Sequence, residues 1–286
     1  MINWYPGHMT KAVRMIEENL RITDCIVYVL DARAPFSCIN PDFERLIGTH
    51  PVIYAVNKAD LGDTARVKAW VKYLSQGNRT AIPMRATASK SAQPILAAVK
   101  NLCRAKIEKY KAKGVRTTVK CMVLGVPNTG KSTVINNLCG SAKTVTGNRP
   151  GVTRGKQWVR VNDFLEVLDT PGTLYPKLNN QTVARRLAYI GSIKDEITDT
   201  YELSCSLCEE LLSIDPTLFS VRYGVEANGG EEMMLAIARK RGYMLRGGEA
   251  DIERAAAALL DDFRRGRLGG ITLDSVDACT EDGTCS

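Results

Sequence analysis

The sequence has few of the residues that zinc sites and membrane spans require. It contains two histidines, and its nine cysteines are scattered apart from Cys205 with Cys208 and a pair at Cys279 and Cys285. A zinc ribbon or finger needs a second ligand pair at suitable spacing, and the sequence has none. No apolar run reaches the ~20 residues that span a bilayer, and the N-terminus lacks a signal-peptide layout. We therefore expect a cytoplasmic protein with no membrane association.

Negative charge is scarce in the first two-thirds of the chain. Residues 1–176 hold 26 Lys and Arg against 12 Asp and Glu, whereas residues 177–270 hold 13 against 15. The densest basic run contains Lys106, Lys109, Lys111, Lys113, Arg116 and Lys120. Such a surplus favours polyanions, above all nucleic acid, although a solvated helix face explains the charge equally well.

Strand-like and helix-like segments alternate through residues 1–176. Apolar, β-branched runs occupy residues 25–30, 51–56, 80–83, 119–124, 157–161 and 165–168, and helical patterns occupy 11–20, 66–74, 94–111 and 132–138. This alternation predicts an α/β domain with a mostly parallel sheet. The last two runs flank a turn at Asn162 and Asp163, which predicts a mixed sheet with one antiparallel edge.

The pattern changes after Pro176. Helical periods at residues 180–189, 201–212, 231–241 and 251–263 are separated by Asp-Pro, Asn-Gly-Gly and Gly-Gly breaks. We predict a small all-helical domain at residues 177–270. An acidic tail at 271–286 is expected to be disordered.

Residues 125–132, Gly-Val-Pro-Asn-Thr-Gly-Lys-Ser, match the phosphate-loop pattern and lie between a predicted strand and a predicted helix. Glycines let backbone N–H groups converge on phosphate oxygens, and the helix N-terminus adds positive potential. Lys131 can bridge the β- and γ-phosphates, while the Ser132 hydroxyl can ligate Mg²⁺. The expected nucleotide contacts here are Asn128, Thr129, Gly130, Lys131, Ser132 and Thr133. This motif predicts a P-loop NTPase.

Two further segments are expected to sense the γ-phosphate. Asp169-Thr-Pro-Gly172 ends a predicted strand, so Asp169 can hold Mg²⁺ through water and the Gly172 N–H can contact the γ-phosphate. Residues 149–155 form a flexible, Gly-rich segment with Thr153. That threonine can complete the Mg²⁺ shell when the γ-phosphate is present, or it can be a plain loop residue.

Base recognition is predicted at Asn57-Lys58-Ala59-Asp60, directly after a strand. The Asp60 carboxylate can accept from both N1–H and the N2 amine of guanine, and adenine offers neither donor. Lys58 would lie along the ring face, and Asn57 would brace neighbouring loops. Ala86-Thr87-Ala88 follows the next strand, and its backbone N–H groups would meet guanine O6. Together these loops predict GTP and GDP as ligands rather than adenine nucleotides.

The order of the motifs is unusual. Ordinary GTPases begin with the phosphate loop, whereas here the base loops at 57–60 and 86–90 precede it. The three-dimensional site is unchanged if the original termini are joined and the chain is reopened at an exposed loop. The sequence therefore predicts a circularly permuted Ras-like G domain at residues 1–176, with the new cut just after Gly172.

The permuted order resembles the YlqF/YawG class of GTPases. The resemblance rests on Trp4-Tyr-Pro-Gly-His8-Met, Asp31-Ala-Arg33, the loops at 57–60 and 127–132, Arg149-Pro-Gly-Val-Thr153 and Asp169-Thr-Pro-Gly172. It implies a GTPase that assists late assembly of the large (50S) ribosomal subunit and is stimulated by the ribosomal particle. It also implies an ANTAR-like helical domain that contacts rRNA. The expected partners are the large-subunit precursor with its rRNA and ribosomal proteins, and the chain is expected to be a monomer.

The resemblance assigns roles to two further residues. His8 resembles the family's proposed catalytic histidine, and it could orient the attacking water because Thr173, not glutamine, follows Gly172. The alternative is a structural histidine that caps a helix. Asn128 resembles the asparagine of GTPases that use K⁺ as an accelerating ion, or it is a neutral variable position. The candidate catalytic residues are His8, Lys131 and Thr153, and intrinsic turnover is expected to be slow.

Two other functions fit the same motifs. One is a GTP-dependent switch that acts on a protein partner, and the other is a nucleotide-gated RNA-binding scaffold with little hydrolysis. The basic run favours RNA, whereas the helical domain offers only local clusters such as Arg185-Arg186. In each case movement of the loop at 169–172 can reorient the helical domain through Pro176.

Overall fold

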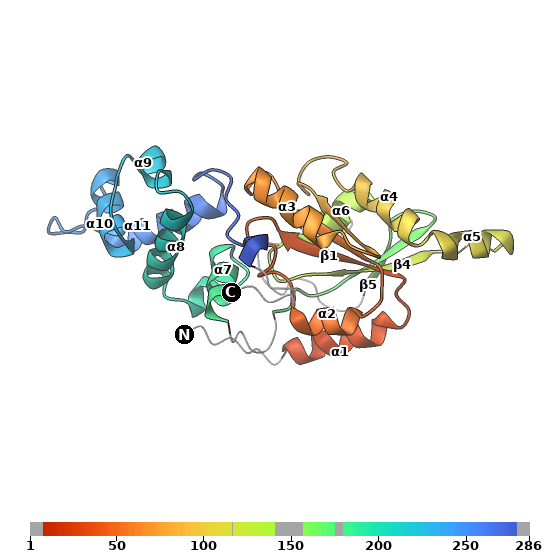
Figure 1. Ribbon diagram of the computed structural model, residues 1–286. Helices are drawn as coiled ribbons and strands as arrows, with labels where there is room; N and C mark the ends of the chain where they lie inside the picture. Colours follow the sequence, from red (N-terminus) through yellow and green to blue (C-terminus); the bar gives the residue numbers. More distant parts are fainter. Residues whose placement is uncertain (1–7, 116, 141–156, 175–179, 279–286) are drawn as a thin grey trace.

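A computed structural model describes residues 8–115, 117–140, 157–174 and 180–278, with the backbone alone described at residues 8–11, 157 and 278. A six-stranded sheet carries helices on both faces, and a group of helices from the C-terminal third of the chain lies at one end of it (Figure 1). The expected domain boundary at residue 176 falls outside the described residues. Within the described ranges, no helix has the length and apolar character needed to cross a membrane.

The sheet has the mixed topology that the sequence predicts. Its strand order is β3-β2-β1-β4-β6-β5, and every neighbouring pair is parallel except β5 with β6. The strands are β1 (Cys25–Asp31), β2 (Val52–Asn57), β3 (Arg79–Pro83), β4 (Val119–Leu124), β5 (Gln157–Arg160) and β6 (Leu165–Asp169). Both β1 and β2 are buried along their whole length, as near-continuous apolar strands of a parallel sheet should be. The predicted α/β fold is confirmed.

Two apolar cores hold helices against the sheet. One contains Ile16, Phe43 and Trp70 from α1 (His8–Leu20), α2 (Pro41–Ile47) and α3 (Thr64–Leu74). The other contains Ile95 and Val134 from α4 (Gln93–Leu102) and α6 (Lys131–Cys139). The single helix predicted at 94–111 is instead two, because the chain turns at Cys103 before α5 (Arg104–Ala112). No side chain of α5 is buried, and α5 extends beyond the sheet at the end away from the C-terminal helices (Figure 1).

The C-terminal third is helical, as predicted. It contains α7 (Gln181–Tyr189), the short 3-10 helix η1 (Asp195–Ile197), α8 (Thr200–Ile214), α9 (Leu218–Tyr223), α10 (Gly230–Arg241) and α11 (Ile252–Arg264). The side chains of Asn180, Asp199 and Asp251 cap the first turns of α7, α8 and α11. A Cβ at Gly230 would lie 2.6 Å from Cys205 Cα, so glycine permits the close approach of α10 to α8.

The structure corrects the disordered tail that was expected from residue 271. Residues 271–274 are buried, and the backbone N–H groups of Ile271 and Leu273 donate to Leu61 O (3.0 Å) and Arg33 O (2.7 Å). The Asp274 carboxylate accepts from the backbone and hydroxyl of Ser37. The acidic composition suggested a solvated segment, but the Thr272 hydroxyl donates to Ala32 O and Asp274 pairs with Ser37, both more than 200 positions away in the chain. Residues 276–278 form the 3-10 helix η2 (Val276–Ala278), and 279–286 lie outside the described residues.

Candidate nucleotide site

The phosphate loop joins the end of β4 to the start of α6, as its motif requires. Three of its residues have positive φ angles, namely Gly125 (148°), Asn128 (61°) and Gly130 (95°). A Cβ at Gly125 would lie 2.5 Å from Val29 O, so β1 approaches too closely for any other residue. The glycine therefore lets the loop pass close to β1 before it leads into the N-terminus of α6, where backbone N–H groups can bind phosphate.

Lys131, in the first turn of α6, lies at the centre of the phosphate loop. Its side chain is buried, and Nζ donates to Val126 O (3.0 Å) inside the loop. Burial lowers the pKa of Lys131 to about 8, against the opposing effect of nearby Asp169. A Cβ at Gly172 would lie 2.7 Å from Lys131 Nζ, so Gly172 reaches the same point. The structure thus brings the 169–172 segment to the phosphate loop.

Ser132 and Asp169 face each other across the same end of the site. The Ser132 hydroxyl donates to Asp169 Oδ2 at 3.4 Å, a long hydrogen bond. A hydroxyl and a buried carboxylate are the hard oxygen ligands that Mg²⁺ prefers in phosphate sites. These two residues could therefore hold Mg²⁺, directly in the case of Ser132 and through water in the case of Asp169.

The base loops lie beside the phosphate loop despite their early position in the chain. Asn57 donates through Nδ2 to Thr129 O (2.7 Å) and accepts at Oδ1 from the backbone N–H of Ala86 (2.9 Å). It therefore braces three loops, as expected. Lys58, held at a φ of 57°, donates to Asn128 O at 2.8 Å. The permuted motif order consequently produces one continuous site.

Asp60 lies in a cavity of about 310 Å³, which it shares with Lys58, Ala86, Thr87, Thr133 and Arg264. Its carboxylate is 3.4 Å from Arg85 Nε, and both side chains are more than a third exposed. Such an exposed ion pair contributes little to stability, so a guanine base can displace it at small cost. The cavity thus contains the carboxylate that was expected to read guanine, next to Lys58 and Ala86 of the two base loops.

The comparisons with known proteins agree with this geometry. A family model described as 50S ribosome-binding GTPase matches residues 120–210. The chain is 36% identical to ribosome biogenesis GTPase A of Bacillus cereus over 97% of its own length and 95% of that protein. The chain belongs to the ribosome biogenesis GTPase A family.

Solved structures extend the comparison to three dimensions. The GDP-bound structure of TM YlqF is 27% identical and matches with a TM-score of 0.64. The match covers 92% of this chain and 100% of that one. The GNP-bound YlqF from T. maritima is 28% identical, with a TM-score of 0.61 over 93% of this chain and 98% of that one. The expected resemblance and the permuted P-loop fold are thereby confirmed. As a member of the ribosome biogenesis GTPase A family, the chain is a GTPase that binds GTP and GDP.

Two candidate residues are not placed by the structure. Thr153 lies within residues 141–156, outside the described residues. His8 begins α1, but its side chain is likewise outside the described part of the chain. The roles expected of Thr153 and His8 in this ribosome biogenesis GTPase A family member therefore stay predictions.

Sequence reasoning missed Asn137, which supports the second base loop from α6. Its Nδ2 donates to Ala86 O (3.0 Å) and to Ala88 O (2.5 Å), while Oδ1 accepts from Ala92 N (3.0 Å). A lone polar residue near the end of an amphipathic helix gives no sequence signal for this role. Asn137 links the phosphate-loop helix to the loop expected to meet guanine O6.

Nucleotide binding in this ribosome biogenesis GTPase A relative should weaken at alkaline pH. The pKa of Lys131 is about 8, and a bound phosphate favours its charged ammonium form. Above pH 8, GDP binding is therefore coupled to the uptake of one proton by Lys131. We expect the Kd for GDP to be about tenfold higher at pH 9 than at pH 7, the slope that uptake of one proton gives. Titrations across this range test it. A Lys131→Arg variant, whose guanidinium stays protonated, should lack the slope, and a wild-type slope in that variant would exclude Lys131 as its source.

Proposed function

We propose that this chain hydrolyses GTP as an assembly factor in late maturation of the large (50S) ribosomal subunit, and that the ribosomal particle stimulates the hydrolysis. One observation carries the proposal. The residue after Gly172 is Thr173, which is 2% exposed and whose backbone N–H donates to Gly125 O of the phosphate loop at 3.4 Å. It is neither the glutamine that orients water in Ras-type sites nor accessible to an attacking water. We therefore expect the protein alone to hydrolyse GTP slowly, and hydrolysis to become fast when a partner completes the catalytic site.

The exposed basic helix α5 supports rRNA as the source of this stimulus. Its four basic residues, Arg104, Lys106, Lys109 and Lys111, surround a single acidic one, Glu108, and none is buried. Lys106 pairs with Asp24 at 2.6 Å and Arg104 pairs with Glu108 at 2.8 Å, which leaves Lys109 and Lys111 to contact phosphates. This surface favours RNA over a protein partner. The precursor particle, with its rRNA and ribosomal proteins, is accordingly the proposed partner.

Turnover should rise at least about tenfold when large-subunit precursor particles are added, because docking would complete the catalytic arrangement. GTP hydrolysis measured with large-subunit particles, small-subunit particles and no particles tests this. A Lys109→Glu, Lys111→Glu variant should keep its basal turnover and lose most of the stimulation, with steep dependence on salt. Equal turnover under all three conditions would contradict the proposal. Particle binding without stimulation would favour the nucleotide-gated scaffold instead.

The ions and the remaining catalytic groups belong to the same proposal. Mg²⁺, held through Ser132 and Asp169, would neutralise the charge that develops on the β- and γ-phosphates. Thr153 would complete its shell in the GTP state, and His8 would orient the attacking water once the particle has docked.

Asn128 is the proposed K⁺ ligand. Its amide nitrogen donates to Gly191 O (2.6 Å), which leaves the amide oxygen, the atom able to ligate a cation, for the site. We expect turnover in KCl to exceed that in NaCl by about tenfold, as one added charge in a preorganised site can do. The preference should disappear in Asn128→Ala. Equal wild-type turnover in both salts would exclude a K⁺ site at Asn128.

A further inference from the structure

The C-terminal helices contact the phosphate loop directly through the turn between α7 and η1. Ser192, which is buried, donates through Oγ to Pro127 O at 2.7 Å. Beside it, Gly191 O accepts the bond from Asn128 Nδ2 at 2.6 Å. Pro127 and Asn128 are residues of the phosphate loop itself. The position of this turn therefore bears on the shape of the nucleotide site.

Arg264, the last residue of helix α11, holds the turn between α7 and η1 in place. Its guanidinium donates to Tyr189 O (3.0 Å) and Ala188 O (2.9 Å), and it forms a two-pronged ion pair with Asp195 at 2.7 and 2.8 Å. These bonds tie the end of α7 to η1 on either side of Gly191. A planar guanidinium with several fixed donors can make such a set of bonds, whereas a lysine ammonium cannot span it.

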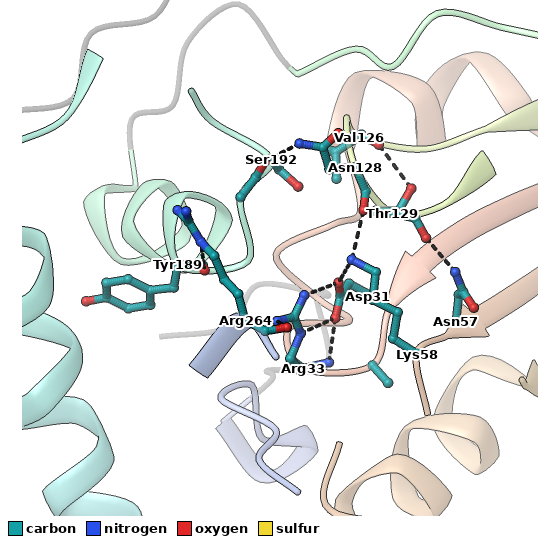
Figure 2. A network of polar contacts seen from close by, with 12 residues as sticks. Asp31, Arg33, Asn57, Lys58, Val126, Asn128, Thr129, Tyr189, Ser192 and Arg264 are labelled. Atoms are coloured by element: carbon teal, nitrogen blue, oxygen red, sulfur yellow. Dashed lines mark hydrogen bonds and ion pairs between the residues drawn. The ribbon is translucent and has the colours of Figure 1, made fainter. Parts of the chain in front are cut away.

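The backbone of Arg264 reaches the other half of the site. Its carbonyl accepts from Arg33 Nη1 at 3.1 Å, and Arg33 pairs with the Asp31 carboxylate through Nε (2.8 Å) and Nη2 (2.7 Å). Asp31 also pairs with Lys58 at 2.8 Å, and Lys58 donates to Asn128 O. Figure 2 shows how these contacts run from Arg264 through Arg33 and Asp31 to the phosphate loop. With the turn at Gly191, they form a closed ring.

Burial stiffens the part of this ring formed by Asp31 and Arg33. The side chains of Asp31 and Arg33 are 1% and 2% exposed, so neither charge can be hydrated if its partner is lost. Burial alone would raise the pKa of Asp31, but Arg33 and Lys58 together hold it well below its usual value. Asp31 therefore stays charged throughout the physiological pH range and keeps its pairs with Arg33 and Lys58. Arg264 also lines the cavity that contains Asp60.

We propose that Arg264 is a positioning residue of the nucleotide site, through which the C-terminal helices hold the phosphate loop and the first base loop in register. It acts through Gly191 and Asn128 on one side and through Arg33, Asp31 and Lys58 on the other. Loops that are held in register lose less entropy when nucleotide binds, so affinity rises. By reciprocity, bound nucleotide stabilises the docked arrangement of the C-terminal helices. This route bypasses the segment around Pro176 that the sequence suggested.

The test compares Arg264→Ala and Arg264→Lys with Arg265→Ala, a matched control. Arg265 is adjacent and exposed, and it pairs with Asp261 one turn earlier. We expect Arg264→Ala to raise the Kd for GDP and the KM for GTP about tenfold. The basal kcat, measured in NaCl where the K⁺ effect of Asn128 is absent, should stay within about twofold, because the ground state and the transition state lose the same binding energy. Arg264→Lys should fall between Arg264→Ala and wild type, and Arg265→Ala should match wild type.

A double-mutant cycle with Asn128→Ala separates positioning from a general loss of stability. If Arg264 acts through the Gly191 turn, Arg264→Ala should cost less than about threefold in GDP affinity once Asn128 is removed. Additive losses, a wild-type Kd in folded Arg264→Ala, or an equal loss in Arg265→Ala would each overturn the proposal. Should Arg264→Ala not fold, Asp195→Asn weakens the same turn more gently. Wild-type GDP affinity in both Asp195→Asn and Arg264→Lys would also overturn it.

Discussion

Replacing Asp60 with asparagine should lower the affinity for GTP by about 10³-fold or more and create binding of xanthosine triphosphate. The carboxylate accepts two hydrogen bonds from guanine, and loss of such pairing in a built site costs 10⁴–10⁵-fold at its largest. The asparagine amide presents one acceptor and one donor. That donor faces the N2 amine of guanine but matches the C2 carbonyl oxygen of xanthine. Titration of both nucleotides into wild type and Asp60→Asn measures the exchange.

The matched control is Asp163→Asn in the turn between β5 and β6. Asp163 is fully exposed and pairs with Arg160, so the change removes a carboxylate that does not line the base cavity. It should leave GTP affinity unchanged. Wild-type affinity for GTP in Asp60→Asn, or loss of affinity without any gain for the xanthine nucleotide, would show that another group reads the base.

Lys131→Met should abolish hydrolysis and at the same time stabilise the empty protein. The ammonium neutralises charge on the β- and γ-phosphates, and we expect kcat/KM to fall about 10³-fold or more without it. In the absence of nucleotide, however, burial lowers the pKa of this lysine to about 8, so the charged form is held at a cost. Methionine removes that cost and fills similar space, and the free energy of unfolding should rise by about 2 kcal/mol.

The stability gain should also depend on pH. Between the folded pKa of about 8 and the unfolded pKa near 10.5, the unfolded wild-type chain binds more protons, so wild-type stability rises with pH there. The advantage of Lys131→Met should therefore be largest below pH 8 and shrink above it. Denaturant unfolding at several pH values measures this, with exposed Lys68→Met as control. A destabilised Lys131→Met protein at pH 7 would show that the burial cost is compensated by other contacts.

Local patterns in the sequence predicted the sheet and the nucleotide loops because both depend on short-range rules. The buried strands have continuous apolar runs, and the loops follow the carboxyl ends of parallel strands, which meet at one edge of the sheet. Asn57, at the end of β2, shows the consequence, since it bonds to Thr129 and Ala86 in loops 72 and 29 positions away. The permuted order could be inferred for the same reason. Spatial neighbours in a sheet do not depend on the order of the strands in the chain.

The contacts that the sequence did not predict join segments with no common pattern. Arg33 and the Arg264 carbonyl are 231 positions apart, and either residue taken alone resembles a surface arginine. Residues 271–274 resemble part of a polar tail in the sequence. Only the structure shows that Asp274 bonds to Ser37 and Leu273 bonds to Arg33. The break at Cys103 also escaped prediction, because no Gly or Pro marks it and the loss of buried side chains after it, in α5, is visible only in the structure. These features depend on tertiary partners.

A crystal structure of this protein with GDP tests the convergence of the loops most directly. We expect the Asp60 carboxylate to lie within about 3 Å of both N1 and N2 of guanine, and Lys131 Nζ to lie within about 3 Å of a β-phosphate oxygen of the same molecule. A base bound away from residues 57–60, with the phosphates still on the phosphate loop, would contradict it.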